Sequence, residues 1–363
     1  MSRFFLRLLI GLFAMAFFGE WPAAGQQAAP ASAEGDFAVK NFQFRSGESL
    51  PELRLHYTTL GKPARDAQGR VRNAVLILHG TGGTGHQFLS PIFAGELFGP
   101  GQLLDATRYY IVLPDGVGHG KSSKPSDGQH ARFPQYDYDD MVAAQHRLLT
   151  EGLSVNHLRL VMGTSMGCMH SFVWGETYSD FMDALMPLAC LPVEIAGRNR
   201  IWRRMVMEAI RNDPEWKSGE YSSEPLQALR TALDLLLIAG SAPLYMQETL
   251  PTREAADKHL DEYFKARFAG LDANDLLYAV NASRNYDPSP QLEKITAPVM
   301  YINSADDFIN PPELGIAPRE IKKVKDGRFV LLPISEETRG HGTHTRAAVW
   351  KQYLGELLAK TAR

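Results

Sequence analysis

A serine held between two glycines is the first feature of the sequence that could do chemistry. The pattern Gly163-Thr-Ser165-Met-Gly167 follows a short apolar run and precedes residues that favour a helix. Such a tight turn from strand to helix forces the serine backbone into a sparsely allowed conformation, and side chains at the two glycine positions would clash. We therefore predict that Ser165 is an exposed nucleophile. A small polar residue in an ordinary strand-to-helix loop is the alternative.

A serine nucleophile needs a base that takes its proton and a carboxylate that orients the base. On this type of turn the acid and then the histidine follow the serine in the chain. Asp306 and Asp307 come directly after the apolar run at 299–303, at a strand end where the sites of α/β sheets are built. His341 and His344 lie on a glycine-containing loop after the next apolar run. This reasoning leaves both pairs of candidates open.

The stretch Leu78-His-Gly-Thr-Gly-Gly-Thr-Gly85 closes an earlier apolar run. Acyl transfer needs two backbone N–H donors for the oxyanion, one just after the nucleophile and one from this loop, and we assign Met166 and Thr81. The same loop fits G-x-G-x-x-G, but Asp105 precedes the following apolar run at 109–113 instead of ending it, so dinucleotide binding is disfavoured. We expect no cofactor and no metal.

These residues need a sheet edge to bring them together. Two alternating segments with a Ser-Gly-Glu turn between them predict an antiparallel hairpin, Phe37–Phe44 and Glu52–Thr59. Short apolar runs without alternation predict strands buried on both faces: Ala74–His79, Tyr109–Leu113, Leu158–Met162, Ala184–Ala189, Val299–Asn303 and Arg328–Leu332. Segments with helical spacing lie between or after them, Asp140–Glu151, Met169–Tyr178 and Thr345–Leu358. The pattern predicts an α/β fold with a mostly parallel central sheet.

The apolar strand runs stop between residues 191 and 285. This segment reads as four helices, Arg198–Arg211, Pro225–Ile238, Thr252–Phe268 and Asp272–Ser283. We interpret it as a helical cap inserted into the core, whose two parts are residues 37–190 and 286–363.

The beginning of the sequence predicts a secretory signal peptide. Arg3 and Arg7 precede an apolar stretch, residues 8–18, and small residues at 23–25 suit a cleavage site. The stretch is shorter than the roughly 20 residues that a bilayer span needs. We expect residues 1–25 to be removed, residues 26–36 to be a flexible lead-in, and the protein to be periplasmic or secreted without stable membrane insertion. An uncleaved anchor is the alternative.

Cys168 and Cys190 are the only cysteines. Each is expected at the same edge of the sheet, close to Ser165, and an oxidising compartment would permit a disulfide. Neighbouring strands allow the distance but do not aim the side chains, so two buried thiols are the favoured interpretation.

Bulk composition narrows the class of partner. The 363 residues carry a net charge of −3 with 44% apolar residues, which leaves no basic surface for nucleic acid. A small-molecule acyl ester is the expected partner, and a homodimer is compatible with the sequence.

With these residues in hand, the chain from about Phe44 to its end resembles the homoserine O-acetyltransferase family of α/β-hydrolases. The matching segments are Ser46-Gly-Glu-Ser-Leu-Pro-Glu-Leu53, Tyr57-Thr-Thr-Leu-Gly61, Leu104-Asp-Ala-Thr-Arg-Tyr-Tyr110, Asp140-Met-Val-Ala-Ala-Gln145, the nucleophile turn and Ala209-Ile-Arg-Asn-Asp-Pro-Glu-Trp216. The resemblance implies an α/β-hydrolase fold, with the family's acid falling on Asp307 and its Gly-His motif on His341.

The departures bear on the substrate. Met207 stands where the resemblance implies an arginine for the amino-acid carboxylate, and Asp115-Gly-Val-Gly-His-Gly-Lys121 replaces an asparagine- and glycine-rich loop. Acetyl-CoA is also a cytosolic metabolite, whereas a signal peptide exports the chain. We therefore expect a secreted serine hydrolase that cleaves an ester, or less readily an amide, through an acyl-enzyme. The alternatives are an O-acyltransferase of the resembled type and a non-catalytic binding protein on the same fold.

Overall fold

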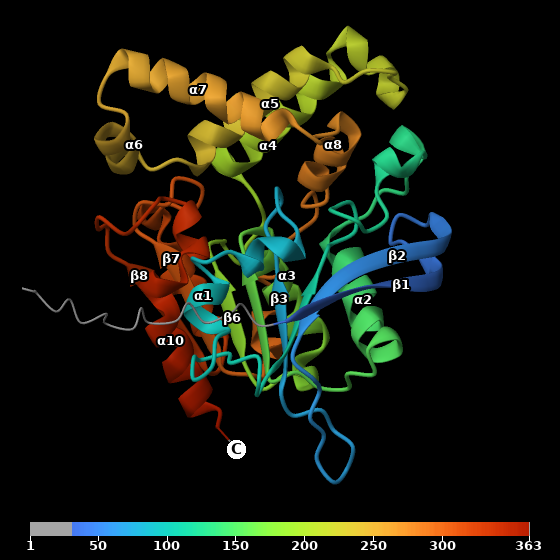
Figure 1. The fold of residues 1–363 in the computed structure, drawn as a ribbon, viewed down its shortest axis with the longest axis vertical. Helices are drawn as coiled ribbons and strands as arrows, with labels where there is room; N and C mark the ends of the chain where they lie inside the picture. Colours follow the sequence, from blue (N-terminus) through green and yellow to red (C-terminus); the bar gives the residue numbers. More distant parts are fainter. Residues whose placement is uncertain (1–30, 363) are drawn as a thin grey trace, which may run out of the picture.

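The computed structural model describes residues 31–362, which build an eight-stranded sheet with helices on both faces and a helical layer above it (Figure 1). The signal-peptide prediction lies outside the described residues. The strands are β1 (Ser32–Gln43), β2 (Ser49–Leu60), β3 (Ala74–Leu78), β4 (Tyr110–Pro114), β5 (Leu160–Thr164), β6 (Leu185–Leu188), β7 (Val299–Ser304) and β8 (Gly327–Leu332). Every apolar run that predicted a strand forms one.

The strand order is β1-β2-β4-β3-β5-β6-β7-β8. β1 and β2 form the expected hairpin, β2 runs antiparallel to β4, and the strands from β4 to β8 are parallel to their neighbours. The prediction of a mostly parallel α/β sheet is confirmed. The expected lead-in is wrong for residues 32–36, which belong to β1 because their backbone pairs with β2 as far as Ser32 opposite Leu60.

Two apolar cores lie on the two faces of the sheet, because successive side chains of a strand point in opposite directions. In β5, Val161 packs in one core, and Leu160 and Met162 pack in the other. Helices α2 (Tyr138–Arg147) and α3 (Met166–Thr177) contribute to the first core, and α1 (Ala94–Leu97) and α10 (Ala347–Lys360) contribute to the second. A short helix, α9 (Ile316–Glu320), precedes β8.

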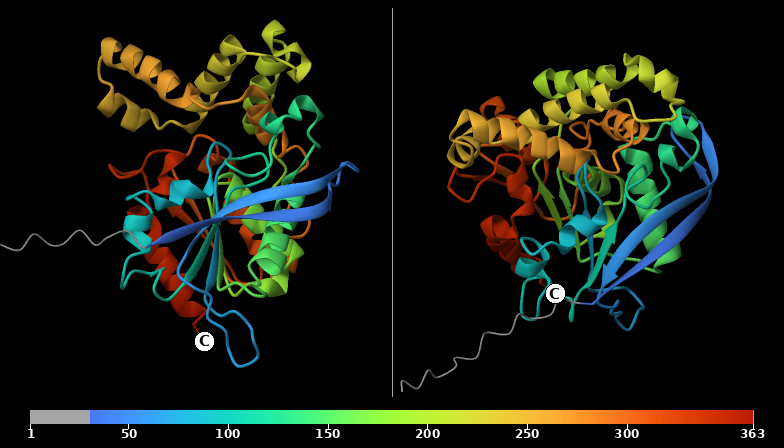
Figure 2. Two further views of the ribbon diagram at one scale, coloured as in Figure 1. Left: turned by 45° about the vertical axis from the view of Figure 1, so that its right-hand side comes forward. Right: turned by 45° about the horizontal axis from the view of Figure 1, so that its top comes forward.

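The cap forms a separate layer above the sheet in all three ribbon views (Figures 1 and 2). It consists of α4 (Gly197–Arg211), α5 (Leu226–Gly240), α6 (Pro243–Thr249), α7 (Arg253–Phe268) and α8 (Ala273–Asn281). It has an apolar core of its own, in which Val206 and Ile210 of α4 pack with Leu229 of α5 and Leu277 of α8. The inserted helical cap is thus confirmed, and α6 is a helix that the sequence pattern did not predict.

No single helix within residues 31–362 is long and apolar enough to cross a membrane. Helices α5 and α6 together reach that length and composition, but their axes bend by 104° at the break between them.

Cys168 and Cys190 form a disulfide, with their Cα atoms 5.8 Å apart. The prediction of two buried thiols is therefore wrong. β5 and β6 pair in parallel register, Thr164 opposite Leu188, so the first turn of α3 and the end of β6 lie side by side. The chain leaves these two strands in directions that bring the two sulfur atoms together, which strand adjacency alone does not determine.

Candidate active site

Ser165 sits on a strained turn between β5 and α3. Its φ is 55° and its ψ is −111°, a conformation that side-chain-bearing residues rarely adopt. A Cβ atom at Gly163 would lie 1.9 Å from Gly167 O, and one at Gly167 would lie 2.0 Å from Leu78 O. Both glycines are therefore required sterically, as the sequence pattern predicted.

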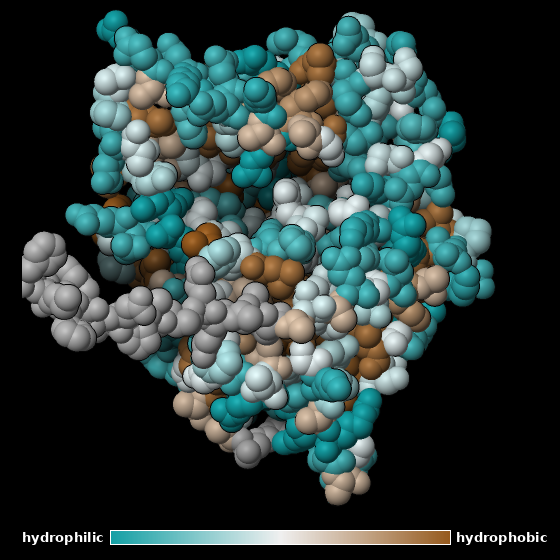
Figure 3. Space-filling model, in the orientation of Figure 1, coloured by the Kyte–Doolittle hydropathy of each residue, from teal (hydrophilic) through white to brown (hydrophobic). Residues whose placement is uncertain are grey.

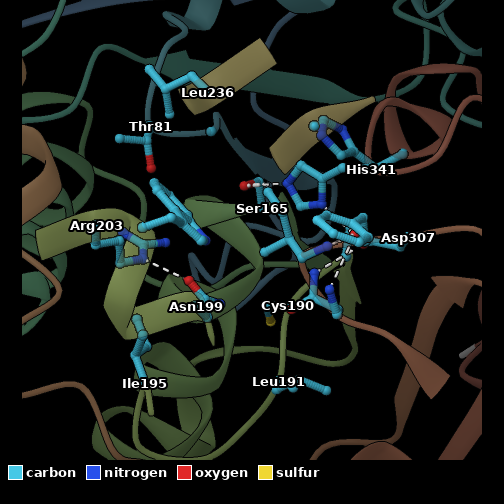
Figure 4. A pocket seen from close by; sticks show the side chains of 18 of the residues that line it. Thr81, Ser165, Cys190, Leu191, Ile195, Asn199, Arg203, Leu236, Asp307 and His341 are labelled. Atoms are coloured by element: carbon cyan, nitrogen blue, oxygen red, sulfur yellow. Dashed lines mark hydrogen bonds and ion pairs between the residues drawn. The ribbon is translucent and has the colours of Figure 1, made fainter. Parts of the chain in front are cut away.

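A continuous chain of hydrogen bonds joins Ser165, His341 and Asp307. His341 Nε2 lies 2.8 Å from Ser165 Oγ, and His341 Nδ1 lies 2.9 Å from Asp307 Oδ2 (Figure 4). If the imidazole carries its proton on Nδ1, that nitrogen donates to the carboxylate while Nε2 accepts from the serine hydroxyl. In this arrangement His341 can take the hydroxyl proton when the serine oxygen attacks.

The carboxylate of Asp307 is almost fully buried yet fully hydrogen-bonded. Its Oδ1 accepts from the backbone N–H groups of Ile309 (2.9 Å) and Asn310 (3.1 Å), and its Oδ2 also accepts from Asn310 Nδ2 (2.9 Å). Burial raises the pKa of Asp307, but the His341 imidazole and the bonds from Asn310 outweigh burial and bring this pKa below its usual value. Asp307 is therefore ionised at neutral pH.

The two rival candidates lie beside this chain without joining it. Asp306 Oδ2 accepts from Gly340 N at 2.9 Å and so holds the backbone of the histidine loop. The ring of His344 packs edge-on against that of His341, with the ring centroids 5.1 Å apart. Burial lowers the pKa of His344 to about 3, so it is a neutral ring at physiological pH.

Thr81 and Met166 offer the backbone N–H groups assigned to an oxyanion. Within residues 31–362, neither N–H donates to a protein acceptor, since Met166 opens α3 and Thr81 lies in the turn after β3. His119, which the sequence reasoning did not single out, lies beneath this turn, with Nε2 3.0 Å from Thr81 O and Nδ1 2.9 Å from Val117 O. His119 therefore ties the Thr81 peptide to the loop after β4.

A cavity of about 1050 Å³ opens between the core and the cap, and Ser165, His341 and Thr81 line it. Figure 3 shows the surface hollowed between the cap and the core. The cap side of the cavity is largely apolar, with Trp202, Leu233, Leu236, Leu271 and Leu276. An acyl or alkyl group of moderate size can therefore lie over the serine against an apolar wall.

Polar side chains of the cap interrupt this apolar wall: Arg198, Asn199, Arg203, Tyr263 and Arg267. Of the three arginines among them, Arg203 is the buried one. Arg203 of α4 is 3% exposed and lines the cavity, where its Nε donates to Asn199 Oδ1 (Figure 4). The sequence reasoning missed it, because an arginine at helical spacing usually faces solvent.

Other binding chemistries find little support in the geometry. The part of the chain that the structure describes contains no group of three or more His, Cys, Asp or Glu side chains placed to hold a metal ion. Asp105 caps its own loop by accepting from Gly101 N (2.7 Å) and Thr107 N (2.8 Å), so it does not serve as the acidic residue of a dinucleotide site.

Comparison with known proteins identifies the family of this chain. The model of the alpha/beta hydrolase fold family matches residues 73–332. A probable acyltransferase from Methanothermobacter thermautotrophicus is 31% identical over 283 residues, which cover 78% of this chain and 85% of that protein. A homoserine O-acetyltransferase from Haloarcula marismortui is 30% identical over 298 residues, 69% of this chain and 71% of that protein.

Among solved structures, an acetylester hydrolase from Corynebacterium glutamicum superposes with a TM-score of 0.78 at 21% identity. The match covers 91% of this chain and 96% of that one, and at this identity it bears on the fold.

Proposed function

The chain belongs to the α/β-hydrolase family as a diverged relative of the homoserine O-acetyltransferases, and from this premise we propose that it is a serine esterase. The observation that carries the proposal is the hydrogen-bonded chain from Ser165 through His341 to Asp307 at the wall of the cavity. The family includes both hydrolases and acyltransferases, so the reaction must be argued from the residues.

In the proposed reaction, Ser165 Oγ attacks the ester carbonyl while its proton passes to His341 Nε2. The carbonyl oxygen becomes an oxyanion held by the N–H groups of Thr81 and Met166. Collapse of this intermediate breaks the acyl–oxygen bond, and His341 returns the proton to the departing alcohol. A water molecule then repeats the sequence on the acyl-enzyme and releases the acid. Asp307 keeps the imidazole in the required tautomer and stabilises its charged form.

An acyltransferase would form the same acyl-enzyme and deliver it to an alcohol, as the names of the two relatives suggest for them. Against this stands Met207, which occupies the position where the resemblance places an arginine for the acceptor. Met207 is 3% exposed within the apolar core of the cap, away from the cavity wall. This position therefore contributes no charge to the cavity, although Arg203, four residues earlier on the same helix, does line it. The departure at Met207 from the acyltransferase pattern supports the choice of water as the acceptor.

We also propose that the enzyme works outside the cytoplasm. The signal-peptide pattern of residues 1–25 supports this, and so does the Cys168–Cys190 disulfide, because disulfides persist in oxidising compartments. N-terminal sequencing of protein recovered from a fractionated expression host tests the point. A mature chain that begins near residue 26 in the periplasmic or secreted fraction supports export, and a full-length cytosolic chain contradicts it.

The test of the reaction is a competition between water and an alcohol. The purified enzyme is incubated with p-nitrophenyl acetate or acetyl-CoA, with and without homoserine, and products are identified by mass spectrometry. The proposal predicts free acetate from the ester in both cases, and no acceleration by homoserine. Formation of O-acetylhomoserine faster than acetate would make the protein an acyltransferase.

A further inference from the structure

Arg203 carries a buried positive charge in the same cavity as Ser165. Its Nε donates to Asn199 Oδ1 at 2.9 Å and its Nη1 donates to Ser283 Oγ at 3.1 Å. The Tyr138 hydroxyl lies beside the guanidinium. The guanidinium also lies over the Trp202 ring, 4.7 Å from its centroid. All four neighbours are neutral. Within residues 31–362, no aspartate or glutamate forms an ion pair with Arg203.

A guanidinium in this state is costly, because burial removes hydration that neutral partners replace only in part. Burial accordingly lowers the pKa of Arg203. Other arginines of α4 avoid this cost: Arg204 is exposed and pairs with Glu208 at 2.6 Å, and the exposed Arg198 stacks over the Phe308 ring. Arg203 thus lacks the anion that buried arginines normally have.

A purely structural role accounts for only some of the hydrogen-bond donors of the Arg203 side chain. The bonds to Asn199 and Ser283 tie α4 to the end of α8, but they use two of the five N–H donors that a guanidinium carries. Neutral side chains could form the same tie without burying a charge. The Nη2 nitrogen has no hydrogen-bond partner among residues 31–362, and because Arg203 lines the cavity this nitrogen can donate to a group that enters it.

The position of Arg203 relative to the nucleophile suits substrate recognition. In Figure 4, Arg203 lies on the Thr81 side of the cavity, and Ser165 lies between it and Asp307. The Tyr138 hydroxyl lies near both Arg203 and Thr81 without a hydrogen bond to either, so the guanidinium and the oxyanion loop share one side-chain neighbour. An ester whose carbonyl carbon rests on Ser165 can therefore extend one arm toward Arg203.

We propose that Arg203 binds a carboxylate of the substrate, so that the enzyme selects esters that are anionic at neutral pH. This inference rests on the proposed esterase function and narrows its substrate class. A carboxylate accepts two parallel N–H bonds from a guanidinium, and it supplies the missing counter-charge. The carboxylate belongs either to the acyl chain, as in a monoester of a dicarboxylic acid, or to the alcohol, as in an acetylated hydroxy acid.

The test compares acidic esters with neutral esters of similar size. On the acyl side, p-nitrophenyl hydrogen succinate is set against p-nitrophenyl butyrate. On the alcohol side, O-acetyl-lactate is set against O-acetyl-lactamide. Wild-type enzyme should prefer the acid in at least one pair, and Arg203→Met should lower kcat/KM for that acid about 100-fold while changing the neutral partner less than about threefold. The pair in which Arg203→Met removes the preference for the acid shows whether the acyl group or the alcohol of the substrate carries the carboxylate.

Two further variants separate charge from packing. Arg204→Met removes the adjacent arginine of α4, which points to solvent, and should leave both pairs unchanged. Arg203→Lys keeps the positive charge but loses the planar guanidinium that can donate two parallel hydrogen bonds. This variant should therefore retain part of the preference for the acidic ester, and its lower kcat/KM for that ester should come mainly from a higher KM. Thermal denaturation checks that each variant is folded. The wild-type comparison needs no variant, so the proposal stays testable even if Arg203→Met does not fold.

Binding without turnover separates this inference from the proposed function. Calorimetry on Ser165→Ala measures affinity for monomethyl succinate and O-acetyl-lactate against their neutral amides. Arg203-dependent preference for the acids without ester hydrolysis by wild-type enzyme would refute the esterase and keep the carboxylate site. The carboxylate site alone would be overturned by a different result. In that case wild-type enzyme hydrolyses neutral and acidic esters at equal kcat/KM, and Ser165→Ala binds the acids and their neutral amides equally well.

Discussion

Removal of the Cys168–Cys190 disulfide should measurably destabilise the fold. The bond closes a loop between residues 22 positions apart, from the first turn of α3 to the end of β6. The entropy that a cross-link of this span removes from the unfolded chain corresponds to about 3 kcal/mol at 25 °C. Both cysteines are buried, and reduction without substitution removes the cross-link while keeping every side-chain atom of the chain.

The expected shift in melting temperature follows from the size of the protein. An unfolding entropy of about 2.1 cal/mol/K per residue over the roughly 330 residues of the folded part gives about 0.7 kcal/mol/K, so the loss of the disulfide lowers Tm by about 4–5 °C. Differential scanning calorimetry of oxidised protein, reduced protein and the Cys168→Ala/Cys190→Ala variant measures this, at several scan rates to detect irreversible unfolding.

The reduced wild type and the double variant should agree to within about 2 °C, because both lose the same constraint and differ only in two small buried sulfur atoms. The single variant Cys168→Ala serves as a control, since reductant should not lower its Tm further. Two free thiols in the unfolded, unreduced protein would refute the disulfide itself. A Tm that does not change on reduction would refute its role in stability.

Two other predictions concern titrating groups. His341→Ala should lower kcat by several orders of magnitude, whereas His344→Ala should change kcat less than about tenfold, because His344 is neutral and contacts only the side of the His341 ring. If a steady-state ester assay finds the reverse order of activities, His341 is not the catalytic base. Burial is the main cause that raises the pKa of Glu176 to about 8, above its usual 4.5. The folded chain thus binds this proton more tightly than the unfolded chain, and stability falls as pH rises from about 4.5 toward 8. Glu176→Gln should therefore raise Tm relative to wild type near pH 8 and leave it unchanged near pH 4, and an equal effect at both values would contradict the ionisation.

The nucleophile turn was predictable because its chemistry is local. Ser165 needs a glycine two residues away on either side, because a Cβ atom at Gly163 or Gly167 would clash with nearby backbone. This requirement is visible in the sequence as the spacing of the two glycines around the serine. The strands were predictable for a similar reason, since their apolar runs are buried on both faces.

The choice between neighbouring candidates depended on geometry beyond the sequence pattern. Asp306 and Asp307 both follow β7, and alternate side chains at a strand end point in different directions. The resemblance to a family indicated Asp307, and the structure places this carboxylate 2.9 Å from His341 Nδ1. Asp306 instead accepts from the backbone of Gly340.

The disulfide and the buried arginine could not be derived from composition or spacing. Pairing of Cys168 with Cys190 depends on the direction in which the chain leaves β5 and β6. The orientation of Arg203 depends on which face of α4 the cap turns toward the core. A helix of the cap packs one face against the apolar core of the cap and turns another face toward the cavity. Helical periodicity indicates that both faces are shielded from bulk solvent, but it does not distinguish one from the other.

The central claim is that Ser165 is the nucleophile of an ester-cleaving site, and the most direct measurement is active-site labelling. The purified enzyme is treated with a fluorophosphonate, digested and mapped by mass spectrometry, while ester hydrolysis is followed in parallel. We predict stoichiometric labelling at Ser165 with matching loss of hydrolysis, and neither labelling nor turnover in a folded Ser165→Ala variant. Modification at another residue, or full activity of Ser165→Ala, would contradict the account.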